Sequence, residues 1–225
     1  MDILLIFAAI ILSYLLGSIN FAVIFANVFT KKDVRNYGSG NAGMTNVLRV
    51  AGPLPGILTF ICDALKGAVA CYIGKYIIFN YLIQNYTGEL YLPIYGALIC
   101  GVFCMLGHVF PVFFQFKGGK GVAISVGIFA VVDWRCIAVV LGVFVALLLI
   151  TRIVSISSLI ATISMPVCIA LFEREANENV YISVALTFII FPSVSTMLYI
   201  YSSLSALYGS GNDIHAITSS SRYSC

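Results

Sequence analysis

The apolar run from Ile3 to Phe29 contains no charged residue. A bilayer core is about 30 Å thick, and a helix needs about 20 residues to cross it. This run therefore predicts a membrane-spanning helix near the start of the chain. It does not fit a cleaved signal peptide, which opens with a basic segment and has a shorter apolar core.

Further apolar runs recur along the chain, in which 61% of residues are hydrophobic and 9% are charged. Soluble domains carry about 25% charged residues, so the composition excludes a soluble globular enzyme. The runs are continuous rather than alternating, which argues against a membrane β-barrel. We expect an all-α integral membrane protein with about seven transmembrane helices. The expected spans are 3–29, 54–80, 91–113, 120–134, 136–151, 156–173 and 180–203. They form a single polytopic domain, 1–203, followed by a polar tail, 204–225.

The loops differ in charge between the two sides of the predicted bundle. An odd number of spans puts the loops 30–53, 113–120 and 151–156 on the same side as the C-terminal tail. Cytoplasmic loops carry an excess of Lys and Arg, so we expect the N-terminus outside and the C-terminus in the cytoplasm. The basic residues on that side are Lys31, Lys32, Arg35, Arg49, Lys117, Lys120, Arg152 and Arg222.

Residues 38–49 form the first of three polar segments on this side, and they read GSGNAGMTNVLR. The GxGxxG spacing mimics a dinucleotide-binding fingerprint, but that motif needs a preceding strand in a soluble βαβ unit. Glycines allow backbone N–H groups to turn toward an anion, and Arg49 adds a cation suited to bidentate contacts. The segment predicts an anion site; the alternative is a flexible cytoplasmic turn.

The second and third segments are similar in character. Residues 117–121, KGGKG, precede an apolar run, and backbone N–H groups at a helix start with a lysine beside them bind anions. The alternative is a basic anchor that faces lipid headgroups. Residues 151–158, TRIVSISS, place serines at the start of another run, where they either cap the helix or contribute hydroxyl groups to a shared phosphate pocket.

Three polar residues within apolar runs require separate interpretation. Asp63 and Lys66 lie one helical turn apart and should face one another, as a structural ion pair or as a substrate contact. His108 is a candidate base, but no Asp follows it at the spacing of a His-x4-Asp pair, since Phe113 occupies that position. The other interpretation is that His108 packs within the loop. The seven cysteines form no CxxC pair, so we expect no metal site and no cofactor.

The three polar segments resemble motifs of one family. Residues 38–49 resemble GSGNxGATNxxR, a signature of the bacterial acyl-phosphate:glycerol-3-phosphate acyltransferases, the PlsY family. Residues 107–123 resemble its GHxFP…FKGGKGVA motif, and residues 151–158 are similar to its TRYVSLAS segment. The resemblance runs from about residue 10 to about residue 200 and is specific, because two long motifs occur in the right order.

The resemblance implies an enzyme of the bacterial inner membrane with its active site at the cytoplasmic face. The implied reaction transfers a fatty acyl group from acyl phosphate to the 1-hydroxyl of sn-glycerol 3-phosphate, giving lysophosphatidic acid and phosphate in phospholipid biosynthesis. The implied partners are these two substrates and membrane lipid, with no nucleic acid.

The family motifs also imply roles for individual residues. Arg49, Lys120 and Ser158 would be the leading phosphate contacts, and His108, Lys120 and Ser158 the catalytic residues. The expected substrate-binding residues are Ser39, Gly40, Asn41, Gly43, Thr45, Asn46, Arg49, Lys117, Gly118, Gly119 and Ser155. One departure concerns the tail: the family's third motif, near RHxxNIxRLxxGxE, has no convincing counterpart in 200–225.

Two alternative functions belong to other classes. A small multi-pass transporter of a phosphorylated or anionic solute predicts ionisable residues in several spans or broken helices at the midplane. Asp63 and Lys66 form one ionisable pair within a single expected span, and the glycines cluster in the cytoplasmic loops, which favours the enzyme. A purely structural membrane subunit predicts no phosphate-containing lipid product from a purified preparation.

Overall fold

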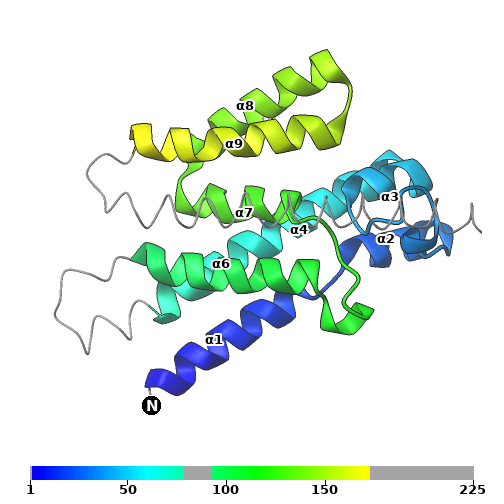
Figure 1. Ribbon diagram of the computed structural model, residues 1–225. Coiled ribbons are helices and arrows are strands. Elements are labelled where there is room, and N and C mark those ends of the chain that lie inside the picture. Colours follow the sequence, from blue (N-terminus) through cyan, green and yellow to red (C-terminus); the bar gives the residue numbers. More distant parts are fainter. Residues whose placement is uncertain (1, 79–92, 173–225) are drawn as a thin grey trace, which may run out of the picture.

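The computed structural model describes residues 2–78 and 93–172, and every regular element in these ranges is helical (Figure 1). The predicted all-α class is therefore confirmed for this part of the chain. The elements are α1 (Asp2–Gly17), α2 (Phe21–Thr30), η1 (Val34–Asn36), α3 (Met44–Ala51), α4 (Pro53–Ile73), η2 (Gly74–Ile78), α6 (Pro93–Val109), η3 (Val112–Phe114), α7 (Val122–Val132), α8 (Trp134–Thr151) and α9 (Val154–Phe172).

The described helices correspond closely to the expected spans. Four stretches are long and apolar enough to cross a membrane: Ile3–Thr30, Pro53–Ile77, Ile94–Phe114 and Trp134–Thr151. The expected spans 120–134 and 156–173 contain shorter apolar helices, Val122–Val132 and Ile156–Ile169. The span expected at 180–203 and the tail 204–225 lie outside the described residues.

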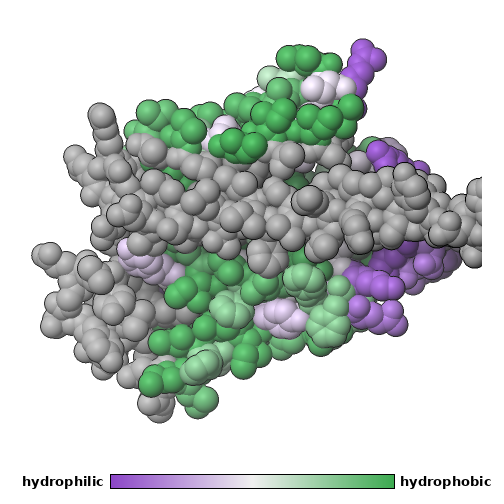
Figure 2. All heavy atoms as spheres, in the orientation of Figure 1, coloured by the Kyte–Doolittle hydropathy of each residue, from purple (hydrophilic) through white to green (hydrophobic). Residues whose placement is uncertain are grey.

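Large apolar side chains cover the outside of these helices. Ile3, Leu149 and Ile150 are 72%, 75% and 79% exposed. Among the coloured residues, Figure 2 shows mostly apolar ones above and below the centre of the view and hydrophilic ones gathered at the end where α3 lies. An apolar belt of this extent is unsuited to water and marks a surface that contacts lipid.

The first span is not the single helix that its apolar sequence predicts. α1 ends at Gly17 and α2 begins at Phe21. The side chain of Asn20 caps α2 by accepting a hydrogen bond from the N–H of Val23 at 3.2 Å. The ammonium of Lys66 in α4 donates to the carbonyl oxygen of Ile19 at 2.7 Å, so a neighbouring helix satisfies a carbonyl that the break leaves without a partner in its own helix.

Close helix packing fixes where the polar loops emerge. The most extensive contacts join α4 to α7, α1 to α6, and α8 to α9. A Cβ on Gly127 of α7 would meet the backbone of Ala64 in α4, so these helices touch at their backbones. The loop between α6 and α7 therefore begins and ends on helices held tightly against the same neighbour.

Candidate active site

The first polar loop is organised around the side chain of Asn46, which is 1% exposed. Its Oδ1 accepts the N–H of Ser39 at 2.9 Å. Its Nδ2 lies within hydrogen-bonding distance of the carbonyl oxygens of Val34 (2.9 Å), Tyr37 (2.9 Å) and Asn41 (3.1 Å). These hydrogen bonds engage both ends of the Asn46 amide with the loop backbone.

Gly38 is required for this arrangement on two grounds. Its φ of +61° lies in the left-handed region that L side chains rarely adopt. A Cβ at this position would also collide with Oδ1 of Asn46. The loop then enters α3 through Gly43, whose carbonyl accepts the N–H groups of Asn46 and Val47.

Arg35 joins the first loop to the second. Its guanidinium pairs with the carboxylate of Asp33 at 2.7 Å and donates to the carbonyl oxygen of Phe114 at 2.9 Å. It also lies over the Phe114 ring, 6.0 Å from the centroid. Hydrogen bonding from Arg35 lowers the pKa of Asp33. Through these contacts Arg35 links η1 to η3.

The second loop, which joins α6 to α7, packs directly against the end of α6. The N–H of Gly119 donates to the carbonyl oxygen of His108 at 3.1 Å. A Cβ on Gly119 would collide with the imidazole of His108 and lie 2.8 Å from the carbonyl oxygen of Ala42 in the first loop. Gly119 therefore lies between the imidazole and the first loop, and the two loops are in contact.

This close packing gives a first testable prediction. Gly119→Ala should destabilise the protein by about 1–3 kcal/mol, because the new Cβ would overlap the buried imidazole and crowd a backbone carbonyl. Thermal unfolding in detergent measures the change. Gly142→Ala in α8 is the matched control, since a Cβ there meets nothing within 4 Å. Equal loss of stability in both variants would contradict the packing argument.

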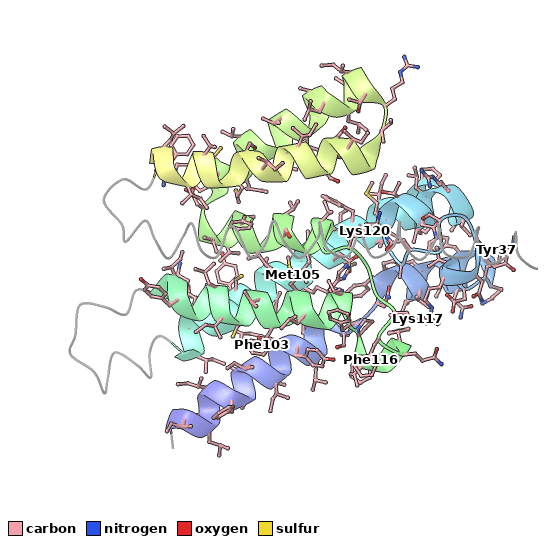
Figure 3. All side chains as sticks on the ribbon, viewed as in Figure 1. Tyr37, Phe103, Met105, Phe116, Lys117 and Lys120 are labelled. Atoms are coloured by element: carbon pink, nitrogen blue, oxygen red, sulfur yellow. The ribbon has the colours of Figure 1, made fainter. Side chains whose placement is uncertain are left out.

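Lys120 and Arg49 bring two positive charges together. Lys120 is half-buried, and burial followed by the charge of Arg49 lowers its pKa from the ordinary 10.5. Arg49 lies on the last turn of α3 and is exposed. Figure 3 shows Lys120, Lys117 and Tyr37 at the same end of the bundle. A half-buried ammonium that is repelled by a second cation favours an anionic ligand.

The remaining expected residues differ in exposure. Lys117 is exposed. Those that are half-buried are Ser39, Gly40, Asn41, Gly43, Thr45, Gly118 and Ser158. Within the described residues, no group of three or more His, Cys, Asp and Glu is arranged to hold a metal ion.

The third segment forms the turn between α8 and α9. Thr151 Oγ1 lies 3.0 Å from Ser157 Oγ and accepts the N–H of Ile153 at 3.2 Å. This turn is at the same end of the bundle as α3 (Figure 1). Ser157 is fully buried and is engaged within the turn, while the side chain of Ser155 lies outside the described part of the structure.

A buried group of charged and titratable side chains lies beneath the second loop. Lys66 Nζ is 2.8 Å from Asp63 Oδ1, which confirms the expected pairing along α4. His108 Nδ1 lies 3.6 Å from the same oxygen. The acid near His108 therefore comes from α4, and not from the position five residues after the histidine that a His-x4-Asp pair uses. Ionisable groups within apolar spans usually face the interior of a helix bundle, which is where these three side chains meet.

Comparisons with known proteins agree on one family. The family model described as glycerol-3-phosphate acyltransferase matches residues 7–205. Glycerol-3-phosphate acyltransferase 2 of Bacillus anthracis is 41% identical over 181 residues, covering 80% of this chain and 86% of that protein. A glycerol-3-phosphate acyltransferase of Thermoanaerobacter sp. (strain X514) is 37% identical over 171 residues, covering 76% and 79%.

A solved structure extends the likeness to the fold. It is the glycerol 3-phosphate form of PlsY, described as an integral membrane glycerol 3-phosphate acyltransferase. It superposes with a TM-score of 0.70 at 32% sequence identity, covering 88% of this chain and 92% of that chain. The lysophosphatidic acid form of PlsY gives the same TM-score and identity.

Proposed function

Because this chain belongs to the glycerol-3-phosphate acyltransferase family, it is a membrane enzyme that transfers an acyl group to glycerol 3-phosphate, and we propose that its active site surrounds Arg49 and Lys120. The donor in this proposal is a fatty acyl phosphate, and the acceptor is the 1-hydroxyl of sn-glycerol 3-phosphate. The observation that carries the proposal is the half-buried position of Lys120 in a loop that contacts the first loop at Gly119 and Ala42.

Both proposed substrates carry phosphate, which suits this end of the bundle. Arg49, Lys120 and Ser158 are the proposed phosphate contacts. The supporting residues are Ser39, Gly40, Asn41, Gly43, Thr45, Lys117, Gly118, Gly119 and Ser155. Asn46 is proposed to shape the first loop rather than to touch substrate, because its amide is occupied by loop backbone.

The chemistry asks mainly for positioning and charge stabilisation. The 1-hydroxyl oxygen attacks the acyl carbon, the bond from that carbon to the phosphate oxygen breaks, and phosphate leaves. A phosphate oxygen of the substrate takes the hydroxyl proton, so no side-chain base is required. His108→Gln should then retain measurable turnover; complete loss of turnover with intact substrate binding would contradict this route.

The proposed location is the cytoplasmic face of a bacterial inner membrane. The basic residues of the first and second loops support this side by the positive-inside rule. A water-soluble acceptor approaches from the cytoplasm, while an acyl donor approaches from the bilayer. A site at the hydrophilic end of an apolar surface (Figure 2) lies where both substrates would meet.

Phosphate release by the purified full-length chain tests the activity. Acyl phosphate and glycerol 3-phosphate should together give lysophosphatidic acid and phosphate, and Arg49→Ala should lose this release. Acyl-CoA in place of acyl phosphate tests the donor, and efficient turnover with it would contradict the proposed one. The broken first span is a feature that the transporter alternative predicts, so uptake of glycerol 3-phosphate into vesicles without acylation would favour transport instead.

The lowered pKa of Lys120 predicts a pH dependence. Only the protonated amine attracts phosphate, so kcat/KM for glycerol 3-phosphate should be maintained below the Lys120 pKa. It should fall as the pH rises through that pKa, at a pH below the ordinary value of 10.5. Lys120→Arg stays protonated throughout this range, and its alkaline limb should move to higher pH. An unchanged limb in Lys120→Arg would assign the titration to another group.

A further inference from the structure

Asp63, Lys66 and His108 are only 1%, 3% and 5% exposed, although each carries a polar or ionisable group. They belong to α4 and α6, two helices that are long and apolar enough to cross a membrane. Ionisable groups at this depth are costly and usually serve a function. A buried ion pair is also weak evidence for stability, since apolar residues of similar size often do as well.

The three side chains connect the break between α1 and α2 to the loop that carries Lys120. On one side, Lys66 donates to the carbonyl of Ile19 in the break between α1 and α2, and its ammonium lies 5.5 Å from the centre of the Phe21 ring. It also lies 2.8 Å from Asp63. The ammonium is therefore held from three directions, and Asp63 is held with it.

On the other side, the group reaches the loop that carries Lys120. Asp63 lies 3.6 Å from Nδ1 of His108. The opposite edge of the imidazole, at Nε2 and Cε1, lies directly beneath Gly119, where no Cβ fits. The backbone of His108 also accepts the N–H of Gly119 at 3.1 Å. A rotated or displaced imidazole would therefore move the residue that immediately precedes Lys120.

We propose that Asp63 and Lys66 are positioning residues for acyl transfer: they hold the His108 imidazole against Gly119 and so set the location of the Lys120 ammonium. The proposal rests on the proposed role of Lys120 in binding phosphate. In this proposal the His108 imidazole fills the space between α4 and the second loop, and the Asp63 carboxylate fixes the orientation and position of the ring.

A double-mutant cycle tests this coupling. Asp63→Asn should lower kcat/KM about 10- to 100-fold, as expected for a displacement of about 1 Å at a reacting centre. In a Lys120→Met background the same substitution should change kcat/KM by less than about 2-fold, because the group that it positions is already absent. A merely structural role for Asp63 would lower activity by the same factor in both backgrounds.

The controls separate charge, folding and position. Asp133→Asn removes one partner of the Asp133–Arg135 ion pair, whose atoms are 3.0 Å apart at the connection of α7 to α8, and should leave kcat/KM unchanged. Where Asp63→Asn alone fails to fold, Asp63→Asn with Lys66→Gln leaves no uncompensated buried charge. It should fold and show the same loss of kcat/KM.

Each further outcome has a definite meaning. Equal losses in the two backgrounds, which a general-base role for the His108–Asp63 pair also predicts, would overturn the positioning proposal while leaving the proposed site intact. Full activity of Asp63→Asn would overturn it as well. Full activity of Lys120→Met would overturn the assignment of Lys120 and the positioning proposal together.

Discussion

Lys120→Met is expected to lower kcat/KM for acyl transfer about 100- to 1,000-fold, the usual effect of removing one preorganised donor from a charged transition state. The ammonium is half-buried beside Arg49, where water screens it less than it screens an exposed lysine. Steady-state phosphate release, measured against the concentration of each substrate, gives the loss. Since Met matches the length of the lysine stem, the change removes charge with little loss of packing.

Lys32→Met is the matched control for this variant. Lys32 is exposed on the same side of the protein and lies 5.3 Å from the centre of the Tyr37 ring. The two variants lose the same charge, so a general effect of net charge on substrate attraction would appear in both. A similar decrease in Lys32→Met would show that Lys120 acts only through the overall field.

Asn46→Asp is the second substitution with a large expected effect, although it changes one NH₂ group to an oxygen. The new oxygen would face the carbonyl oxygens of Val34, Tyr37 and Asn41, all of which now accept from the amide. A buried charge without a partner destabilises by about 3–5 kcal/mol. We expect a lower midpoint of thermal unfolding and loss of phosphate release, because the loop before Arg49 loses its central support.

Asn36→Asp makes the same chemical change at an exposed position of η1 and should leave both quantities nearly unchanged. Asn46→Asp with wild-type stability and turnover would contradict the structural role given to this amide. Asn46→Ala should fall between the two variants, because it leaves the carbonyl groups unpaired but adds no repulsion.

The sequence predicted the helices well because bilayer thickness and hydropathy determine them almost directly. It missed the break at residues 18–20, and the reason is physical. Hydropathy treats Ser18 and Asn20 as tolerable polar residues within an apolar run. The break depends on a cap that Asn20 provides to α2 and on a donor, Lys66, that comes from another helix.

The sequence identified the loops that form the candidate site, but it did not identify the contacts between their side chains. Glycine-rich segments with Arg49 and Lys120 identified the two loops, and the structure brings them together at Gly119 and Ala42. Asn46 matches the family motif as well as the other predicted substrate-binding residues do, and only the structure shows that its amide bonds to the loop backbone. The proximity of Asp63 to His108 depends on the packing of α4 against α6, which no local pattern encodes.

The hydrogen bond from Lys66 to Ile19 also bears on how the protein is made. A lysine that enters the hydrocarbon layer on an isolated helix costs about 2.5–3.5 kcal/mol during insertion. Asp63 travels on the same helix and offsets part of that cost, but the carbonyl of Ile19 belongs to the preceding span. The first span also carries an open carbonyl until α4 arrives. The two spans therefore satisfy each other's polar groups only once they are packed together, so the cost of inserting Lys66 is fully offset only in the assembled bundle.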